Sequence, residues 1–408
     1  MARMLGSSGL RKRVAALGRD VRTLFDDLRG VHPSPLVARR PGRHPAPTAP
    51  ATAAPSATSA AARPLVVREL HRETLDALTI VLADPTGAPI RFVPGQFLTL
   101  LVPIDGETVR RAYSICSSVD DPAQVAVTCK RVAGGKVSTW LHERLAVGDV
   151  LSVLGPSGEF TVTPDPATRR DLLLIAGGSG ITPIMAIVRA VLAHEPDSRL
   201  TLIYGNRTAS DVIFLPDLDA LVAAHPGRLE VHHVLERGVD GDGGTIAGAR
   251  VGRLDRATVA AALDAVADRV GPDAHVYVCG PTAAMAQVRD ELTARGIPAA
   301  RRHEERFASP ERGAGAAAAQ RLVLARPGGD VDVVVPPGST ILDAGLAAGV
   351  PMEFSCAMGG CGACAVDLRD GEVELDEPNC LSPEERGRGR ILACVARPMS
   401  PCTVVVPR

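Results

Sequence analysis

The residues best suited to chemistry are cysteines, and most of them lie near the end of the chain. The sequence has nine cysteines, of which six lie close together: Cys356, Cys361, Cys364, Cys380, Cys394 and Cys402. In a compartment that keeps thiols reduced, such clustering argues for a metal centre rather than a disulfide framework. Four of the six follow a C-x4-C-x2-C pattern with one more distant cysteine, a spacing at which thiolates hold the two irons of a 2Fe-2S cluster. The candidate ligands are Cys356, Cys361, Cys364 and Cys394.

Two other interpretations of these cysteines are a zinc site and reactive thiols that bind no metal. Zinc usually takes two C-x2-C pairs, and the sequence has one such pair, Cys361 with Cys364. The loop also contains glycines, which let a chain turn tightly and point backbone N–H groups at sulfur. A 2Fe-2S cluster is therefore the favoured interpretation, and Cys380 and Cys402 are expected to be packed thiols.

A second group of residues could hold a cofactor that has both a ring and a phosphate. In Arg111-Ala-Tyr113-Ser114, placed at the start of a strand, Arg can bind a phosphate through two N–H groups. Tyr can lie against a planar ring, and a Ser hydroxyl can hydrogen-bond a ring nitrogen. A Gly-rich stretch follows at a predicted helix start, where backbone N–H groups bind anions; its residues are Gly135, Lys136, Val137 and Ser138. For either motif alone, an ordinary salt bridge or turn is the simpler interpretation.

A Gly-rich turn between a predicted strand and a predicted helix is the third candidate site. It lets phosphates approach the backbone, and the dipole of the following helix favours their charge. Its pattern differs from the G-x-G-x-x-G dinucleotide fingerprint. The candidate nucleotide-binding residues here are Gly177, Gly178, Gly180, Thr182 and Pro183.

Two short motifs later in the chain complete the candidate site. Cys279-Gly280-Pro281 ends a predicted strand, at the edge where open α/β sheets bind ligands. Cys279 could equally be a plain buried thiol. Glu305 and Phe307 stand just before an Ala/Gly-rich linker.

Hydrophobic patterning predicts the elements that must position these residues, and they fall into three domains. Short strand-like runs separated by turns over 64–165 indicate an antiparallel β-barrel. Over 166–308, apolar strands alternate with helical patterns, which indicates a parallel sheet flanked by helices, an α/β domain. After a linker over 309–320, a hairpin, a helix and the cysteine loop over 321–408 indicate an α+β domain. A multidomain protein is expected.

The first 63 residues carry no recognisable motif. Apolar residues recur at helical spacing over 10–29, with Arg and Lys on the polar side, and 44–64 is a linker of Ala, Pro, Thr and Ser. The amphipathic helix is expected either to pack on its own protein or to contact a partner or a membrane surface.

Charge and hydropathy argue against several classes of protein. The formal net charge of −1 gives no general attraction to nucleic acid. No apolar run is long enough to span a bilayer, and the N-terminus lacks the apolar segment of a secretory signal. A cytoplasmic protein is expected.

Together, the motifs resemble the ferredoxin–NADP reductase superfamily followed by a plant-type ferredoxin domain, over roughly residues 64–408. Arg111–Ser114 resembles the superfamily's flavin-holding motif, and Gly135–Ser138 resembles its pyrophosphate-holding motif. The Gly-rich turn and Cys279-Gly280-Pro281 resemble its NAD(P)-binding motifs. The order of the domains resembles the reductase components of phenylacetyl-CoA epoxidase and ketosteroid hydroxylase systems.

This resemblance implies roles for individual residues and a fold for the last domain. The flavin is expected to be FAD, with Ser114 and Glu305 near its reactive ring nitrogen and Phe307 beside the ring. Cys279 is expected beside the nicotinamide. The cysteine-rich domain is expected to have the ferredoxin-like β-grasp fold.

The function that follows is electron transfer from NAD(P)H through FAD to the 2Fe-2S cluster. NAD(P)H gives two electrons as a hydride and the cluster accepts one at a time, so a flavin is needed between them. The expected electron acceptor is an oxygenase component. The alternatives are a membrane fatty-acyl desaturase or hydroxylase as acceptor and, in another class, a redox-sensing regulatory protein.

The choice between NADPH and NADH depends on Arg207. This residue follows the second strand of the nucleotide domain, where an Arg can accept the 2′-phosphate of NADPH. That placement gives a slight preference for NADPH. In the alternative interpretation, Arg207 pairs with Asp211 as a plain surface contact.

Overall fold

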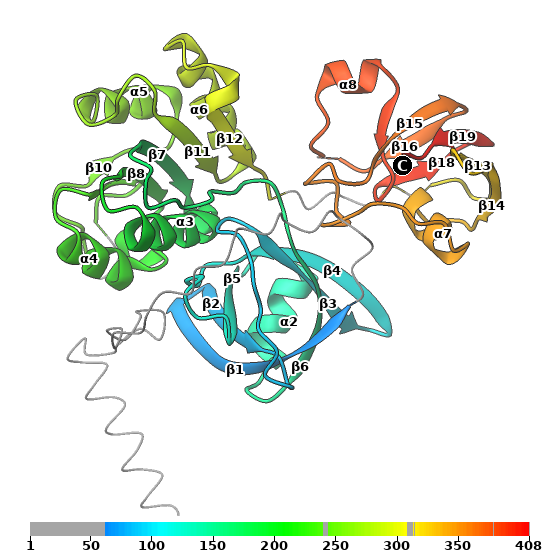
Figure 1. Cartoon of the computed structure of the whole chain (residues 1–408), viewed down its shortest axis with the longest axis horizontal. Coiled ribbons are helices and arrows are strands. Elements are labelled where there is room, and N and C mark those ends of the chain that lie inside the picture. Colours follow the sequence, from blue (N-terminus) through cyan, green and yellow to red (C-terminus); the bar gives the residue numbers. More distant parts are fainter. Residues whose placement is uncertain (1–61, 240–243, 308–312, 314, 378, 408) are drawn as a thin grey trace, which may run out of the picture. The chain divides into compact units, whose positions relative to one another are not determined.

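The structure is a computed structural model that describes residues 62–239, 244–307, 313, 315–377 and 379–407. The helix expected over 10–29 and nearly all of the linker expected over 44–64 lie outside these residues. In the described part of the chain, no helix is long and apolar enough to cross a membrane. Figure 1 labels the elements of the three domains.

The first domain is a closed antiparallel barrel with one helix. Its elements are β1 (Arg63–Thr74), β2 (Ala77–Ala83), β3 (Phe97–Ile104), β4 (Glu107–Ser114), β5 (Gln124–Lys130), α2 (Lys136–Arg144) and β6 (Val150–Ser157). The strand order is β4-β3-β6-β1-β2-β5. A bridge between Ile115 and Val127 joins the chain after β4 to β5 and so closes the sheet. Alternate side chains of the strands, among them Leu65, Ile80 and Leu100, form the buried core.

A tight turn between β3 and β4 decides where the Arg111–Ser114 motif lies. Asp105 and Gly106 have backbone φ angles of 52° and 81°, the left-handed conformation that two-residue hairpin turns require. β4 therefore begins at Glu107, and the motif is at the end of the strand. The prediction that the motif starts a strand was wrong, because the Asp-Gly turn places the start of β4 four residues earlier.

The first strand of the barrel also begins earlier than the expected end of the linker at Pro64. Arg63 and Pro64 already pair with Val153 and Ser152 of β6. The Arg63 guanidinium lies 2.6 Å from a carboxylate oxygen of Asp84. These contacts make Arg63 the first residue of the barrel.

The second domain is a parallel sheet with helices on both faces (Figure 1). Its strands are β7 (Asp171–Gly177), β8 (Arg199–Asn206), β9 (Leu229–Leu235), β10 (Arg250–Val251), β11 (His275–Cys279) and β12 (Arg302–Glu305). Its helices are η1 (Gly178–Gly180), α3 (Ile181–His194), η2 (Ala209–Asp211), α4 (Leu215–Ala224), α5 (Arg256–Ala265), α6 (Thr282–Ala294) and η3 (Ala299–Arg301). The strand order is β10-β9-β8-β7-β11-β12. Val259, Met285 and Leu292 bring α5 and α6 onto one face of the sheet, and the expected α/β architecture is confirmed.

The third domain has a mixed sheet of strand order β14-β13-β19-β15-β17 and a separate pair, β16-β18. Its elements are β13 (Gln320–Ala325), β14 (Val331–Val335), α7 (Ile341–Ala347), β15 (Ala365–Asp370), β16 (Val373–Leu375), α8 (Pro383–Gly387), β17 (Arg390–Leu392), β18 (Ala396–Pro398) and β19 (Cys402–Val405). Thr340 is the N-cap of α7: its side chain accepts a hydrogen bond from the backbone N–H of Asp343. Leu322, Leu342 and Val404 are buried in its core. The cysteine loop runs between α7 and β15, and the predicted α+β domain is confirmed.

Candidate active site

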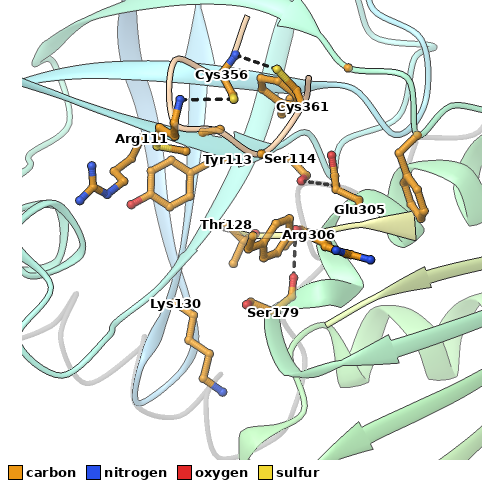
Figure 2. A pocket seen from close by; sticks show the side chains of 18 of the residues that line it. Arg111, Tyr113, Ser114, Thr128, Lys130, Ser179, Glu305, Arg306, Cys356 and Cys361 are labelled. Carbon is orange, nitrogen blue, oxygen red and sulfur yellow. Dashed lines mark hydrogen bonds between the residues drawn. The ribbon is translucent and has the colours of Figure 1, made fainter. Parts of the chain in front are cut away.

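One pocket of about 670 Å³ gathers most of the predicted flavin-site residues together with part of the cysteine loop (Figure 2). Its walls come from the end of β4, the start of α2, the turn after β7, the end of β12 and the cysteine loop. The predicted residues that line it are Arg111, Tyr113, Ser114, Gly135, Lys136, Val137, Ser138, Thr182, Glu305, Phe307, Cys356 and Cys361. Residues expected to bind a flavin and residues expected to bind the cluster thus share one pocket.

The three residues expected to act in catalysis lie next to one another. The Ser114 hydroxyl donates a hydrogen bond of 2.9 Å to Oε2 of Glu305, as Figure 2 shows. In the parallel pairing of β11 with β12, Cys279 is the register partner of Glu305. The edge strand β12, which patterning did not predict, is therefore the element that brings Glu305 to both partners.

The half-buried carboxyl of Glu305 has a raised pKa. Burial raises the pKa of Glu305 to about 8, the hydrogen bond from Ser114 opposes this shift, and nearby Cys361 adds to it. Burial also raises the pKa of the Cys279 thiol well above its usual value, with Glu305 as a second cause. At pH 7 both groups are therefore uncharged, and a proton is available at the Glu305 carboxyl.

Aromatic side chains form the wall of the pocket on which a planar ring could lie. Tyr113, Phe97, Phe160 and Phe307 all line it. The Cys129 thiol donates a hydrogen bond of 3.3 Å to the Tyr113 hydroxyl, which fixes the far end of the tyrosine ring. A pocket of this size with aromatic walls and a few polar groups fits the ring system of a flavin.

Other residues of the pocket suit a phosphate group. α2 begins at Lys136, and no side chain caps its first turn, so first-turn N–H groups can serve an anion. Arg111, Lys130 and Lys136 line the pocket and add positive charge. The aromatic side chains and the basic residues near the first turn of α2 together fit a flavin that carries phosphate.

The Gly-rich turn and the Cys279-Gly280-Pro281 motif pack so closely that their glycines are required. A Cβ atom on Gly180 would lie 2.0 Å from the carbonyl oxygen of Cys279, and one on Gly177 would lie 2.8 Å from Cδ of Pro281. The two motifs therefore form one continuous backbone surface at the carboxyl edge of the sheet, where open α/β sheets bind nucleotides. Of this region, Ser179 and Thr182 line the pocket. The other predicted nucleotide-site residues of this region do not line it: Gly177, Gly178, Gly180, Pro183, Cys279, Gly280 and Pro281.

Lys130 is a basic residue of the site that sequence analysis missed. It ends β5, and its Nζ atom lies 4.0 Å from the position that a Cβ of Gly178 would take. It lines the pocket with Thr128 and Ser179 (Figure 2). Lys130 belongs to no motif, and only the packing of the barrel against the nucleotide domain brings it to the Gly-rich turn.

The four candidate cluster ligands form two close pairs. The Sγ atoms of Cys364 and Cys394 are 3.1 Å apart, and Cys361 Sγ accepts a hydrogen bond of 3.4 Å from the backbone N–H of Cys356. Among the described residues, no three His, Cys, Asp or Glu side chains are placed so that they could together hold a single metal ion. Two pairs of thiols suit a group with two irons better than a single ion.

The loop around these thiols points backbone N–H groups at sulfur, as its glycines led us to expect. The N–H of Gly359 donates to Cys394 Sγ at 3.2 Å, and that of Met358 donates to Cys356 Sγ at 3.4 Å. The Cys356 thiol and nearby backbone N–H groups lower the pKa of Cys361. These donors stabilise negative charge on sulfur, which thiolate ligands require.

Arg207 lies outside the pocket and is already paired. Its Nε atom donates a hydrogen bond of 3.0 Å to Asp211, the contact expected in the alternative interpretation. Its Nη2 atom also lies 2.8 Å from a carboxylate oxygen of Asp76, in the turn between β1 and β2. The sequence near Arg207 gave no indication of this second partner.

Three family models match successive parts of the chain. Residues 65–162 match an oxidoreductase FAD-binding domain, 174–290 an oxidoreductase NAD-binding domain, and 326–399 a 2Fe-2S iron-sulfur cluster binding domain. These matches confirm the three cofactor classes, and their limits agree with the three domains of the fold.

Known reductases match most of this chain. The ferredoxin reductase component of 3-ketosteroid-9-alpha-monooxygenase from Mycobacterium tuberculosis is 39% identical, over 82% of this chain and 93% of that protein. A component of the 1,2-phenylacetyl-CoA epoxidase from Escherichia coli is 34% identical, over 84% of this chain and 96% of that protein. Among solved structures, phthalate dioxygenase reductase matches with a TM-score of 0.59 and 26% identity, over 85% of this chain and 98% of that chain.

Proposed function

Since the chain belongs to the ferredoxin–NADP reductase superfamily and, within it, to the reductase components that carry a C-terminal 2Fe-2S domain, we propose that it supplies electrons from NADH or NADPH to an oxygenase component. The observation that carries this proposal is the shared pocket. Ser114 and Glu305 line it from one side, and Cys356 and Cys361 line it from another. A flavin held there would lie beside the cluster loop, so electrons would not need to leave the chain between the two groups.

The bound flavin supplies the conversion between a two-electron hydride and single electrons. The side chains around it have simpler tasks. Tyr113 and Phe307 orient a ring, and the first turn of α2 with Arg111 holds phosphate. Ser114 keeps the Glu305 carboxyl in place, and Glu305 holds a proton at its carboxyl oxygen.

The partner is proposed from the relatives, because the reductases named above serve a monooxygenase, an epoxidase and a dioxygenase. A membrane desaturase or hydroxylase as acceptor remains the second candidate, and a regulatory redox sensor the third. Sustained oxidation of NADH or NADPH by the purified chain with cytochrome c as acceptor tests the enzyme proposal. A single reduction without turnover would support a sensor instead. The cluster chemistry suits the cytoplasm, where thiols stay reduced.

The flavin released from the protein is expected to be FAD. The aromatic wall could hold the ring of either flavin, but the uncapped first turn of α2 and the basic residues near it suit a diphosphate. Heat denaturation followed by chromatography identifies the flavin, and iron analysis is expected to give two irons for each flavin. Recovery of FMN would contradict the assignment of the diphosphate site.

Deletion of residues 1–61 is expected to leave electron transfer within the chain nearly intact while weakening turnover with the native partner. The barrel begins at Arg63, so this truncation removes none of its strands. The amphipathic pattern over 10–29 includes Gly18, which costs a helix about 1 kcal/mol relative to Ala. Such a helix is marginal alone in water and needs a surface to order against.

The measurement compares cytochrome c reduction with coupled turnover of the oxygenase for the full chain and the truncated chain. Loss of flavin binding or precipitation of the truncated protein would contradict the docking role. It would instead make the segment a structural part of the reductase.

A further inference from the structure

The charges around Arg207 bear on which nicotinamide coenzyme the protein uses. Arg207 directly follows β8, whose parallel pairing with β7 sets Gly205 beside Gly177 at the Gly-rich turn. This edge is where α/β sheets bind the adenosine half of a dinucleotide, and an Arg after the second strand can accept a 2′-phosphate. NADPH differs from NADH only in this group, which carries nearly two negative charges at pH 7.

A local carboxylate fixes the orientation of the Arg207 guanidinium. The Asp211 carboxylate accepts hydrogen bonds from both Nε and Nη2 of Arg207. The Thr208 hydroxyl donates a hydrogen bond of 2.9 Å to the same carboxylate. Residues 207 and 211 are four positions apart, and Asp211 is the last residue of η2, so this pair forms within one short segment. Asp211 therefore orients Arg207 whichever coenzyme binds.

A second carboxylate reaches Arg207 from another domain. Asp76 lies in the turn between β1 and β2 of the barrel, and its Oδ2 atom is 2.8 Å from Arg207 Nη2. The same oxygen lies 3.7 Å from Nζ of Lys130. Two hydrogen bonds hold this turn in place. The Thr74 hydroxyl donates to the Asp76 carboxylate, and the backbone N–H of Arg131 donates to the Asp76 carbonyl oxygen. Asp76 is therefore a fixed partner rather than a loose surface side chain.

The local charge balance disfavours a 2′-phosphate. Arg207 and Lys130 contribute two positive charges, and Asp76 and Asp211 contribute two negative charges, so the group is formally neutral. A 2′-phosphate would have to displace a carboxylate from Arg207 or accept close repulsion from it. NADH brings no such charge and meets no such penalty.

We propose that Asp76 is a specificity-determining residue, which neutralises Arg207 from the flavin domain and makes the reductase prefer NADH. This inference rests on the proposed function and deepens it. It also replaces the slight preference for NADPH expected from Arg207 alone. Because Asp76 is far from Arg207 in sequence, the preference depends on the contact between the barrel and the nucleotide domain.

The test measures kcat/KM for NADH and for NADPH with the full, cofactor-loaded chain. Wild type is expected to favour NADH. Asp76→Asn should raise the NADPH-to-NADH ratio about tenfold, since one unit of charge is removed beside the phosphate; tenfold corresponds to about 1.4 kcal/mol. The double variant Asp76→Asn with Arg207→Ala should lose this gain, because Arg207 is the group that would meet the 2′-phosphate. Asp84→Asn is the matched control: it removes another barrel carboxylate paired to an Arg, at Arg63, and should leave the ratio unchanged.

A binding measurement separates coenzyme recognition from turnover. Adenosine 2′,5′-bisphosphate, as a competitive inhibitor against NADH, should bind Asp76→Asn about tenfold more tightly than wild type, while 5′-AMP should not. Asp76→Ser serves as a second variant if the first does not retain its flavin. A wild-type preference for NADPH, or an unchanged ratio in both Asp76 variants, would overturn the inference. So would a gain that persists without Arg207. If neither coenzyme reduces the flavin in wild type, the proposed function itself fails.

Discussion

Replacing any one of Cys356, Cys361, Cys364 and Cys394 by Ser is expected to remove the 2Fe-2S cluster and to abolish electron transfer to the oxygenase partner. The four thiols form two close pairs, and backbone N–H groups of the loop point at their sulfur atoms. A serine hydroxyl does not supply the soft, charged ligand that iron in such clusters requires. Iron content and visible absorbance report the cluster, and coupled turnover reports the transfer.

The flavin should survive these substitutions, because most of its site lies in the barrel. NADH oxidation with ferricyanide, which can take electrons from the flavin, should therefore persist. The matched controls are Cys380→Ser and Cys402→Ser. Cys402 is buried in β19, and Cys380 lies beside the loop, where its N–H donates to the Gly359 carbonyl at 2.8 Å. Loss of iron from Cys380→Ser alone would show that the ligand set is wrong.

Replacing Glu305 by Gln is expected to slow flavin reduction by NADH about a hundredfold. This is the lower limit of the rate loss that is usual when a positioned proton donor or acceptor is removed. Glutamine keeps the shape and can still accept the hydrogen bond from Ser114, but it cannot release a proton. The wild-type carboxyl has a pKa of about 8, so it is protonated below that pH and ionised above it. The wild-type rate should therefore fall as pH rises through about 8, whereas the rate of the variant should not change there.

Stopped-flow absorbance at the flavin band, between pH 6 and 9.5, measures this effect. Glu230→Gln is the matched control, because Glu230 is a carboxylate of the same domain that pairs with Arg269 and lies outside the pocket. It should show the wild-type profile. A Glu305→Gln variant with the same rate and the same pH profile as wild type would show that this carboxyl plays no part in the reaction.

Local signals in the sequence predicted much of the fold. The cysteine spacing predicted which thiols lie close together in the loop, and the apolar runs predicted most strands, because both are set by residues close together in the chain. The Arg111–Ser114 motif was placed at the wrong end of its strand since the Asp105-Gly106 turn was overlooked. That turn was readable, because Asp-Gly is a strong signal for a two-residue hairpin.

Other features depended on contacts between domains, which no local pattern encodes. Lys130 reaches the Gly-rich turn only because β5 packs against the nucleotide domain, and Asp76 reaches Arg207 from the β1–β2 turn. The strand β12 is four residues long and half-buried, with no alternation to reveal it. Its role is to hold Glu305 between Ser114 and Cys279.

Transfer of electrons from flavin to cluster within one chain is tested most directly by anaerobic rapid mixing of the full, cofactor-loaded chain with excess NADH. Flavin absorbance and the EPR signal of the reduced cluster are followed together at several protein concentrations. We expect the flavin to be reduced first and the cluster to follow at a rate that does not depend on protein concentration, because both groups border the same pocket. A cluster that stays oxidised beside reduced flavin, or a rate of cluster reduction that rises in proportion to protein concentration, would contradict transfer within the chain.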